Sequence, residues 1–338
     1  MKRILIHDCT LRDGSHAVSH SLNEHQVGVY CQVANLAGVP IVEVGHGNGL
    51  GASSLQLGES LVADAQLLKL AKRNLGNSKL GIHVIPGFAT IKRDLSMAIE
   101  AGVDVVRVAS HCTEADITER HISYARLHSK EVYGVLMMSH MASKEVLVEE
   151  SLKMQYYGAE GVVLMDSAGA YLPHDVTERV SALVNKLSIS VGFHGHNNLG
   201  MAIANSVVAV EAGATILDGT ARGFGAGAGN AQLEVLVAVL EKLGYVTDID
   251  LYKVLDVGEI AEKEFIKALP AIKSTSVISG LAGVFSGFAK PVERIAQKYG
   301  IDPRDVFFEL GRRKVVAGQE DLIIEVAIQL SGGGRENG

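Results

Sequence analysis

Eight short apolar runs, rich in β-branched residues, recur along the chain at intervals of about 25 to 40 residues, the size of a strand–helix repeat. The expected strands are Ile4–Ile6, Ile41–Val44, Leu80–Ile85, Val103–Val108, Val132–Met138, Gly161–Met165, Ile189–Phe193 and Ile216–Asp218. Segments with apolar residues at helical spacing lie between them, at Glu24–Leu36, Leu61–Leu75, Leu95–Ala101, Lys144–Tyr157, Asp175–Leu187, Gly200–Ala212 and Leu233–Leu243. Eight such repeats predict a parallel (β/α)8 TIM barrel with its helices outside.

An open, doubly wound sheet is the alternative fold, and it would need a Gly-x-Gly-x-x-Gly turn directly after a strand. The first strand is followed instead by Asp-Cys-Thr-Leu-Arg-Asp at 8–13, which has no glycine to let the backbone approach a pyrophosphate. The barrel is therefore favoured.

The pattern changes after about Lys242, where helical segments follow one another without a strand signal between them. The expected helices are Asp248–Ala268, Pro291–Tyr299, Asp302–Leu310 and Glu320–Leu330. We therefore expect a barrel domain at 1–262, a mainly helical C-terminal domain at 263–330, and a disordered tail at 331–338.

Charge and cysteine content limit the classes of partner and the compartment. The net charge is −7 and no long basic block occurs, so neither nucleic acid nor an anionic membrane is an expected partner. The three cysteines are too few and too scattered for a disulfide framework, which favours a reducing cytoplasm. No apolar run approaches the roughly 18 residues that a membrane helix needs.

Ionisable residues gather where strands end, which is where the functional groups of a barrel lie. The turn after the first strand carries Arg12, Asp13 and His16, and the seventh strand ends in His194-Gly-His196. Residues two apart in an extended segment point to the same side, so both imidazoles can reach one point. Two imidazoles and a carboxylate are a common facial set for a catalytic divalent metal, and Asp13 is our choice for the carboxylate.

The other two residues of the first turn, Arg12 and His16, are candidates for roles in the reaction. Arg12 is either a structural ion-pair partner or a guanidinium placed against a developing enolate oxygen. His16 is close enough to act as a general base. No lysine follows a predicted strand, which disfavours Schiff-base chemistry and leaves metal-stabilised enolate chemistry as the better option.

A glycine-rich loop at 223–230 follows the eighth strand and precedes a helix. Barrels often bind phosphate after the seventh and eighth strands, at a helix N-terminus. Such loops are also simply flexible turns, and the sequence leaves both interpretations open.

Taken together, these motifs resemble the metal-dependent aldolase and lyase barrels whose first strand ends in Asp-x-Thr-Leu-Arg-Asp. This group includes 3-hydroxy-3-methylglutaryl-CoA lyase and the isopropylmalate synthases. The resemblance is greatest to the 4-hydroxy-2-oxovalerate aldolase family and covers nearly the whole chain. The stretches that carry it are Asp8–His16, Glu43–Leu50, Val105–Asp116, Leu136–Met141, Asp166–Ala170, His194–Leu199, Gly225–Asn230 and Gly318–Asp321.

The resemblance implies retro-aldol cleavage of a 4-hydroxy-2-oxoacid to pyruvate and an aldehyde, as in aromatic hydrocarbon catabolism, or the reverse condensation. It implies a site for Mn²⁺, or for Mg²⁺ or Co²⁺, at Asp13, His194 and His196, with His194 beside the substrate. It also implies that Arg12 stabilises the pyruvate enolate, that His16 accepts the proton of the 4-hydroxyl, and that Ser167 contacts the substrate carboxylate. An acylating aldehyde dehydrogenase is the implied partner, in a homo- or hetero-oligomer.

One position departs from the family pattern. The family carries Gly-x-Ala-Gly-Val-Tyr-Ser-Ser-Phe near its C-terminus, and here Gly280–Phe288 reads Gly-Leu-Ala-Gly-Val-Phe-Ser-Gly-Phe. Phe285 replaces a tyrosine whose hydroxyl reaches the active site in the family. We therefore expect Phe285 to contact the substrate and to select a bulkier or less polar aldehyde than acetaldehyde.

Two other functions remain as alternatives. An acyl-CoA-dependent synthase of the same group would carry Gly-x-Gly-Glu-Arg-x-Gly-Asn in the 223–230 loop, where this chain has Ala226 and Gly227, and the lyases would carry a cysteine there. A metal-binding partner subunit without activity is the second alternative, and Phe285 is the only feature that favours it.

Overall fold

The computed structural model describes residues 2–332 and contains one closed barrel of eight parallel strands in the order β1 to β8. The strands are β1 (Leu5–Leu11), β2 (Ile41–Val44), β3 (Lys79–Val84), β4 (Val105–His111), β5 (Glu131–Met137), β6 (Gly161–Asp166), β7 (Ser190–Gly195) and β8 (Ile216–Gly219). The predicted (β/α)8 fold is confirmed.

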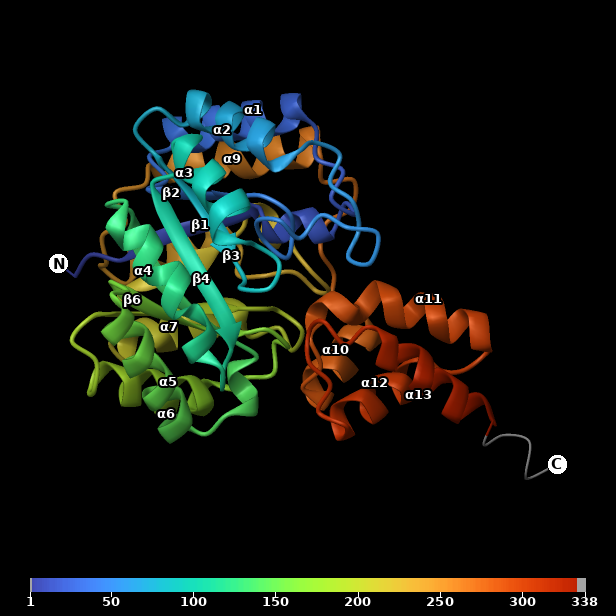
Figure 1. Cartoon of the computed structure of the whole chain (residues 1–338). Helices are drawn as coiled ribbons and strands as arrows, with labels where there is room; N and C mark the ends of the chain where they lie inside the picture. The colour runs from blue at the N-terminus through green and yellow to red at the C-terminus, as the bar shows by residue number, and fades with distance from the viewer. Residues whose placement is uncertain (1, 333–338) are drawn as a thin grey trace.

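Helices cover the outside of the barrel and continue into the C-terminal part of the chain (Figure 1). Those around the barrel are α1 (Glu24–Leu36), α2 (Asp64–Leu75), α3 (Ser96–Glu100), α4 (Glu119–Leu127), α5 (Lys144–Tyr157), α6 (Pro173–Val184), α7 (Ala202–Glu211), α8 (Leu233–Lys242) and α9 (Leu251–Glu264). The C-terminal ones are α10 (Ser274–Ala282), α11 (Ala289–Tyr299), α12 (Pro303–Arg312) and α13 (Asp321–Gly332).

The register of β1 brings the first and last strands together. His7 pairs with Ile41 of β2 on one side and with Asp218 of β8 on the other. The carboxyl ends of β7, β8 and β1 therefore lie next to one another at one rim of the barrel. Residues from distant parts of the chain meet at this rim.

Separate hydrophobic clusters support the two parts of the chain. In the barrel, one cluster extends between the strands and their surrounding helices, and a smaller one is formed by strand residues such as Val135 and Val163. The C-terminal cluster is formed by α10 to α13 around Phe288, Phe307 and Leu310. Figure 1 shows the C-terminal helices as a distinct group beside the barrel. Hydrogen bonds join the two groups, including Ser286 N to the Ser167 carbonyl (2.9 Å) and Ser286 Oγ to Asn198 Oδ1 (2.8 Å).

The sequence patterns did not predict α4 and α10. Each has only nine residues, and α10 is rich in serine, threonine and glycine, which are weak helix formers. α10 is held by packing against α12, which a local pattern does not reveal.

The last helix ends at Gly332, two residues beyond the expected end of the C-terminal domain at 330. The rest of the expected disordered tail, 333–338, lies outside the described residues. Within residues 2–332, no helix has both the length and the hydrophobicity needed to cross a membrane.

Candidate metal centre

The turn after β1 places Asp13 and Arg12 at the barrel rim. The backbone reverses through hydrogen bonds from Arg12 N to the Cys9 carbonyl (3.1 Å) and from Ser15 N to the Arg12 carbonyl (3.1 Å). Ser15 Oγ donates to the Gly45 carbonyl at the end of β2 (3.1 Å), which ties the turn to the next strand. Asp13 is only 2% exposed as a result.

The two histidines at the end of β7 are oriented by partners on neighbouring strands. His194 Nδ1 donates to Asp218 Oδ2 of β8 (2.8 Å), and His196 Nδ1 donates to the Asp166 carbonyl of β6 (3.0 Å). A histidine whose Nδ1 carries the proton presents the lone pair of Nε2. Both Nε2 atoms are buried, and within the described residues neither has a hydrogen-bond partner.

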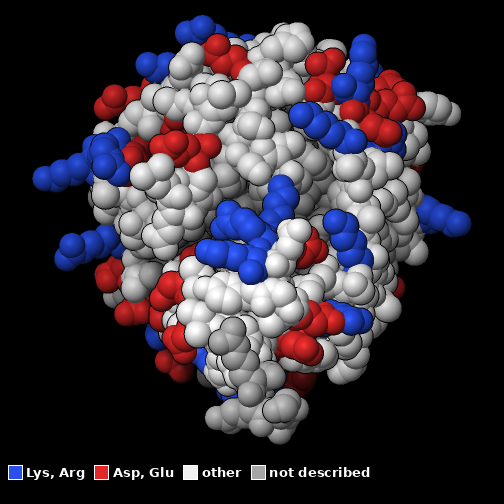
Figure 2. Space-filling view, turned by 90° about the vertical axis from the view of Figure 1, so that its right-hand side faces the viewer, with Lys and Arg blue, Asp and Glu red and all other residues white. Residues whose placement is uncertain are grey.

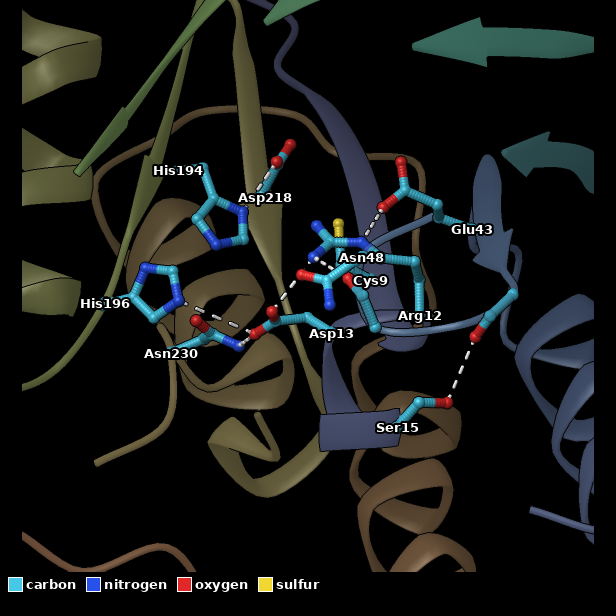
Figure 3. A network of polar contacts seen from close by, with 12 residues as sticks. Cys9, Arg12, Asp13, Ser15, Glu43, Asn48, His194, His196, Asp218 and Asn230 are labelled. Carbon is cyan, nitrogen blue, oxygen red and sulfur yellow. Dashed lines mark hydrogen bonds and ion pairs between the residues drawn. The ribbon is translucent and has the colours of Figure 1, made fainter. Parts of the chain in front are cut away.

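Asp13, His194 and His196 converge as predicted. One ligand atom from each lies within 4.8 Å of the other two, and His196 Nε2 is 3.8 Å from Asp13 Oδ2. Figure 3 shows the two rings on one side of the Asp13 carboxylate. Two unpartnered imidazole nitrogens and one carboxylate fit a divalent metal ion.

The ionisation states of His196 and Asp13 are also those that binding of a cation requires. Burial lowers the pKa of His196 to about 4, so its imidazole is neutral and can donate a lone pair. Burial alone would raise the pKa of Asp13, but the adjacent Arg12 guanidinium and the neighbouring histidines together outweigh burial and hold this pKa well below its usual range. Asp13 is therefore an anion at neutral pH.

The glycine-rich loop at 223–230 packs directly on the metal centre. Asn230 Nδ2 donates to Asp13 Oδ2, and Asn230 Oδ1 is buried with no hydrogen-bond partner in the described part of the chain. A Cβ on Gly225 would come within 2.5 Å of Asp13 Oδ2, so only glycine allows this approach. Sequence reasoning missed Asn230, because an asparagine that ends a loop looks like an ordinary turn residue.

A buried network of charges connects Arg12 to His194. Arg12 Nε donates to Glu43 Oε1 (2.6 Å), Arg107 Nη1 donates to Glu43 Oε2 (3.1 Å), and Arg107 Nη2 donates to Asp218. Arg12 therefore has the structural ion-pair role considered above. Its Nη2 is nevertheless buried without a partner among the described residues, so one donor remains for a ligand.

The sequence patterns assigned no role to Glu43, Asp218 or Arg107. The available signal for Arg107 was a lone charge in the apolar strand β4.

His16 lies beside this centre, half-buried among other histidines. Its ring meets the edge of the His20 ring at a centroid distance of 5.3 Å, and His20 stacks on His46 at 3.6 Å. Gly47 leaves room for the His16 ring, since a Cβ there would be 2.6 Å from it. Burial lowers the pKa of His16 to about 4, which leaves it neutral and able to accept a proton.

The last two predicted site residues differ in their surroundings. Ser167 follows β6 directly, is buried, and accepts a hydrogen bond from Met138 N at Oγ (2.9 Å). Phe285 instead packs against Phe288 at a ring-centroid distance of 5.6 Å, in the C-terminal hydrophobic cluster. The structure thus groups Arg12 with the three candidate ligands and places Phe285 in a different environment.

A cavity of about 760 Å³ opens between the barrel rim and the C-terminal helices. Its wall includes His16, Gly225 and Ser286, and Phe285 is not among the residues that line it. The cavity reaches His16 from solvent, while Asp13, His194 and His196 are not among its lining residues.

Comparison with known proteins identifies the family of this chain. Residues 3–261 match the HMGL-like family, and residues 270–332 match the DmpG-like communication domain. The chain is 65% identical over 331 residues to a 4-hydroxy-2-oxovalerate aldolase of Spirochaeta aurantia, covering 98% of this chain and 97% of the relative. It is 63% identical to a 4-hydroxy-2-oxovalerate aldolase of Pectobacterium atrosepticum, covering 98% and 96%.

Among solved structures, the carboxyl transferase domain of Rhizobium etli pyruvate carboxylase, with pyruvate and biocytin, superposes with a TM-score of 0.82. The identity is 15% over 98% of this chain and 61% of that one, so this likeness shows the fold alone.

The chain belongs to the HMGL-like family. Within it, the chain belongs with the 4-hydroxy-2-oxovalerate aldolases, which are carbon–carbon lyases. The family predicted from the sequence motifs is confirmed.

Proposed function

We propose that this protein is a divalent-metal-dependent (class II) aldolase that cleaves a 4-hydroxy-2-oxoacid to pyruvate and an aldehyde through a pyruvate enolate, or runs the reverse condensation. One observation supports this most strongly. Two unpartnered imidazole nitrogens and one carboxylate converge in a buried region, and the arginine that donates to this carboxylate keeps one unpartnered guanidinium nitrogen. The names of the relatives support the same reaction.

Asp13, His194 and His196 would hold the metal, with the unpartnered Oδ1 of Asn230 as a further oxygen donor. We propose Mn²⁺ as the ion, with Mg²⁺ and Co²⁺ as alternatives. A divalent ion in this place supplies Lewis-acid polarisation of the substrate carbonyl.

The chain's own residues would carry the remaining steps. Arg12 donates from Nη2 to the oxygen on which the enolate charge develops, and Glu43 and Asp13 hold the guanidinium in position. A ring nitrogen of neutral His16 takes the proton of the 4-hydroxyl as the carbon–carbon bond breaks. Ser167 keeps its hydroxyl proton for the substrate carboxylate while its oxygen accepts from Met138 N.

The role of Phe285 is part of this proposal in a modified form. Phe285 does not line the cavity, whereas its neighbour Ser286 does. We propose that Phe285 influences the aldehyde half of the substrate through the position of the 283–287 segment rather than by direct contact.

The test is pyruvate release from 4-hydroxy-2-oxovalerate and its longer homologues, measured through lactate dehydrogenase. The enzyme is treated with EDTA and then given Mn²⁺, Mg²⁺ or Co²⁺. We expect no release after EDTA and the largest recovery with Mn²⁺. Full activity after rigorous metal removal, or no activity with any of the three ions, would contradict the proposal.

We further propose two domains, 1–262 for catalysis and 263–330 for contact with an acylating aldehyde dehydrogenase in the cytoplasm. The separate hydrophobic clusters and the DmpG-like communication domain match support this division. Exposed apolar side chains on the C-terminal helices offer a contact surface: Leu281, Phe308, Ile324 and Ile328.

Leu281→Asp with Phe308→Asp should abolish co-elution with such a dehydrogenase and leave metal-dependent pyruvate release intact.

A further inference from the structure

The cavity between the barrel rim and the C-terminal helices has a basic wall. Lys273, Lys290 and Arg294 all line it, and in the part of the chain that the structure describes none of them forms an ion pair. The carboxylate in the lining is Glu293, whose Oε1 accepts from Thr275 Oγ1 (2.9 Å). Figure 2 shows lysine and arginine side chains gathered beside a hollow on this side of the molecule. Such a surplus of positive charge is notable in a chain with a net charge of −7.

This basic wall is tied to the catalytic turn. Lys290 Nζ donates to the carbonyl oxygens of His16 (3.2 Å) and Ala17 (2.8 Å). The ammonium group therefore lies next to the backbone of the residue proposed as the base. Because His16 faces the 4-hydroxyl in the proposed reaction, the substituent on C4 would extend from His16 into this cavity. A group carried by that substituent would therefore lie near these positively charged side chains.

The lysines also affect each other. Burial, and after it the repulsion from Lys273, lowers the pKa of Lys290. Two like charges close enough to interact are destabilising unless an anion lies between them. The cavity is also larger than a two-carbon aldehyde requires, since about 760 Å³ lies within the range that holds whole drug-sized ligands.

We propose that this cavity is a subsite for a terminal anionic group, a carboxylate or a phosphate, on the aldehyde half of the substrate, bound by Lys273, Lys290 and Arg294. The proposal rests on the proposed aldolase function and names its substrate class. The proposal keeps the expectation, drawn from Phe285, of an aldehyde bulkier than acetaldehyde. It replaces the expectation of a less polar aldehyde by that of a charged one. The reason is that Phe285 packs in the C-terminal cluster, while basic side chains form the cavity wall.

The test compares aldehydes of matched shape in the addition of pyruvate catalysed by the Mn²⁺-loaded full-length protein. Succinic semialdehyde carries a terminal carboxylate, 4-methylpentanal replaces that carboxylate by an isopropyl group, and glycolaldehyde phosphate carries a phosphate. We expect kcat/KM to be at least tenfold higher for one of the anionic aldehydes than for 4-methylpentanal. The better of the two anionic aldehydes identifies the group.

The decisive variant is Lys273→Gln with Arg294→Gln, which removes two charges and leaves the Lys290 contact to His16 in place. The ratio of kcat/KM for the anionic aldehyde to that for 4-methylpentanal should fall about tenfold. The matched control is Lys186→Gln with Lys242→Gln, which removes two exposed charges after α6 and at the end of α8, and it should leave the ratio unchanged. An equal loss for both aldehydes would mean general attraction of 2-oxoacids and would overturn the subsite.

Two further measurements separate this inference from the proposed function. Exchange of the pyruvate methyl protons with deuterium tests the enolate machinery without any aldehyde. If exchange occurs and no anionic preference appears, only the subsite is refuted. If exchange is absent, the aldolase proposal fails. Binding of glutarate, measured by calorimetry, then tests the subsite independently of any reaction. Glutarate binding should weaken about tenfold in the Lys273→Gln/Arg294→Gln variant, and unchanged or undetectable glutarate binding would refute the subsite.

Discussion

Arg107 lies at the centre of the polar network inside the barrel, although the strand that carries it is otherwise apolar. Its guanidinium has no solvent exposure and joins Glu43, which holds Arg12, to Asp218, which holds His194. Burying a charge is costly unless partners compensate it, and here two carboxylates do so. This network keeps the proposed enolate donor and a candidate metal ligand in one rigid arrangement.

Asp218 provides the first prediction at this scale. Asp218→Asn keeps the size of the side chain but removes the anion that orients and polarises His194 through Nδ1. We expect metal affinity to weaken by about 10- to 100-fold. Competition with a fluorescent chelator measures this affinity. Asp256→Asn, an exposed acid on α9, is the control and should bind metal like the unmodified protein. Equal affinity in the two variants would exclude an orienting role for Asp218.

Glu43 provides a prediction about acid stability. Burial alone would raise its pKa, but Arg107 and Arg12 outweigh burial and lower the pKa from 4.5 to about 2. The stabilisation from this ionised carboxylate is fully present above pH about 4.5 and is lost as the pH falls toward 2. The free energy of unfolding of the unmodified protein should fall as the pH drops through this range. In Glu43→Gln this decrease should be smaller, by on the order of 3 kcal/mol. Urea unfolding at pH 5.5, 4.5 and 3.5 measures the slope. About 1.4 kcal/mol of the difference should appear between pH 4.5 and 3.5, and parallel curves would contradict this role.

At the scale of elements, the loop after β8 shapes the metal centre. It was expected either to bind phosphate or to be a flexible turn, and instead it packs its backbone against Asp13. Asn197 N donates to the Gly229 carbonyl (2.8 Å), which fixes the loop to the end of β7. Gly225 is thus explained by close approach to the carboxylate, and Gly229 by close approach to the Gly223 carbonyl.

Gly225→Ala tests this packing. The backbone at Gly225 does not need a positive φ, so alanine is conformationally allowed, and its methyl group would displace Asn230 Nδ2 and the Asp13 carboxylate that it contacts. We expect metal affinity to fall at least tenfold while the fold is retained, as judged by circular dichroism. Gly28→Ala is the matched control, because a Cβ there would meet its nearest neighbour at an ordinary 3.6 Å. Unchanged metal binding in Gly225→Ala would show that the loop yields and does not position Asp13.

At the scale of the whole molecule, the C-terminal helices close one side of the barrel rim and supply part of the cavity wall. His140 Nε2 donates to the Gly283 carbonyl (2.9 Å), and Lys290 reaches the turn after β1. The site therefore depends on both parts of the chain. A ligand that bridges strands of the barrel should stabilise the folded molecule as a whole.

Metal binding provides the prediction at this scale. Binding to the folded state alone raises the free energy of unfolding by about 2.7 kcal/mol at 100 times the dissociation constant. We expect the Tm to rise with Mn²⁺ in the unmodified protein and to stay constant in His196→Gln, which removes one ligand. Differential scanning calorimetry with and without EDTA measures this shift. An equal Tm shift in both proteins would indicate metal binding elsewhere.

The sequence by itself determined the barrel and the convergence of the candidate metal ligands. Strand and helix periodicities are local, and residues at the carboxyl ends of parallel strands must share one rim, so Asp13, His194 and His196 could be placed together without coordinates. Arg12 and His16 followed from the same turn.

Only the tertiary structure decided what surrounds these residues. Arg107 and Asp218 are 111 positions apart, and Asn230 reaches Asp13 across 217 positions, so no local pattern relates them. The packing of Phe285 in the C-terminal cluster and the basic wall around His16 depend on how α10 and α11 dock against the barrel. Such contacts arise from packing between segments that are distant in the sequence. A local sequence pattern does not show which distant segments will pack against each other.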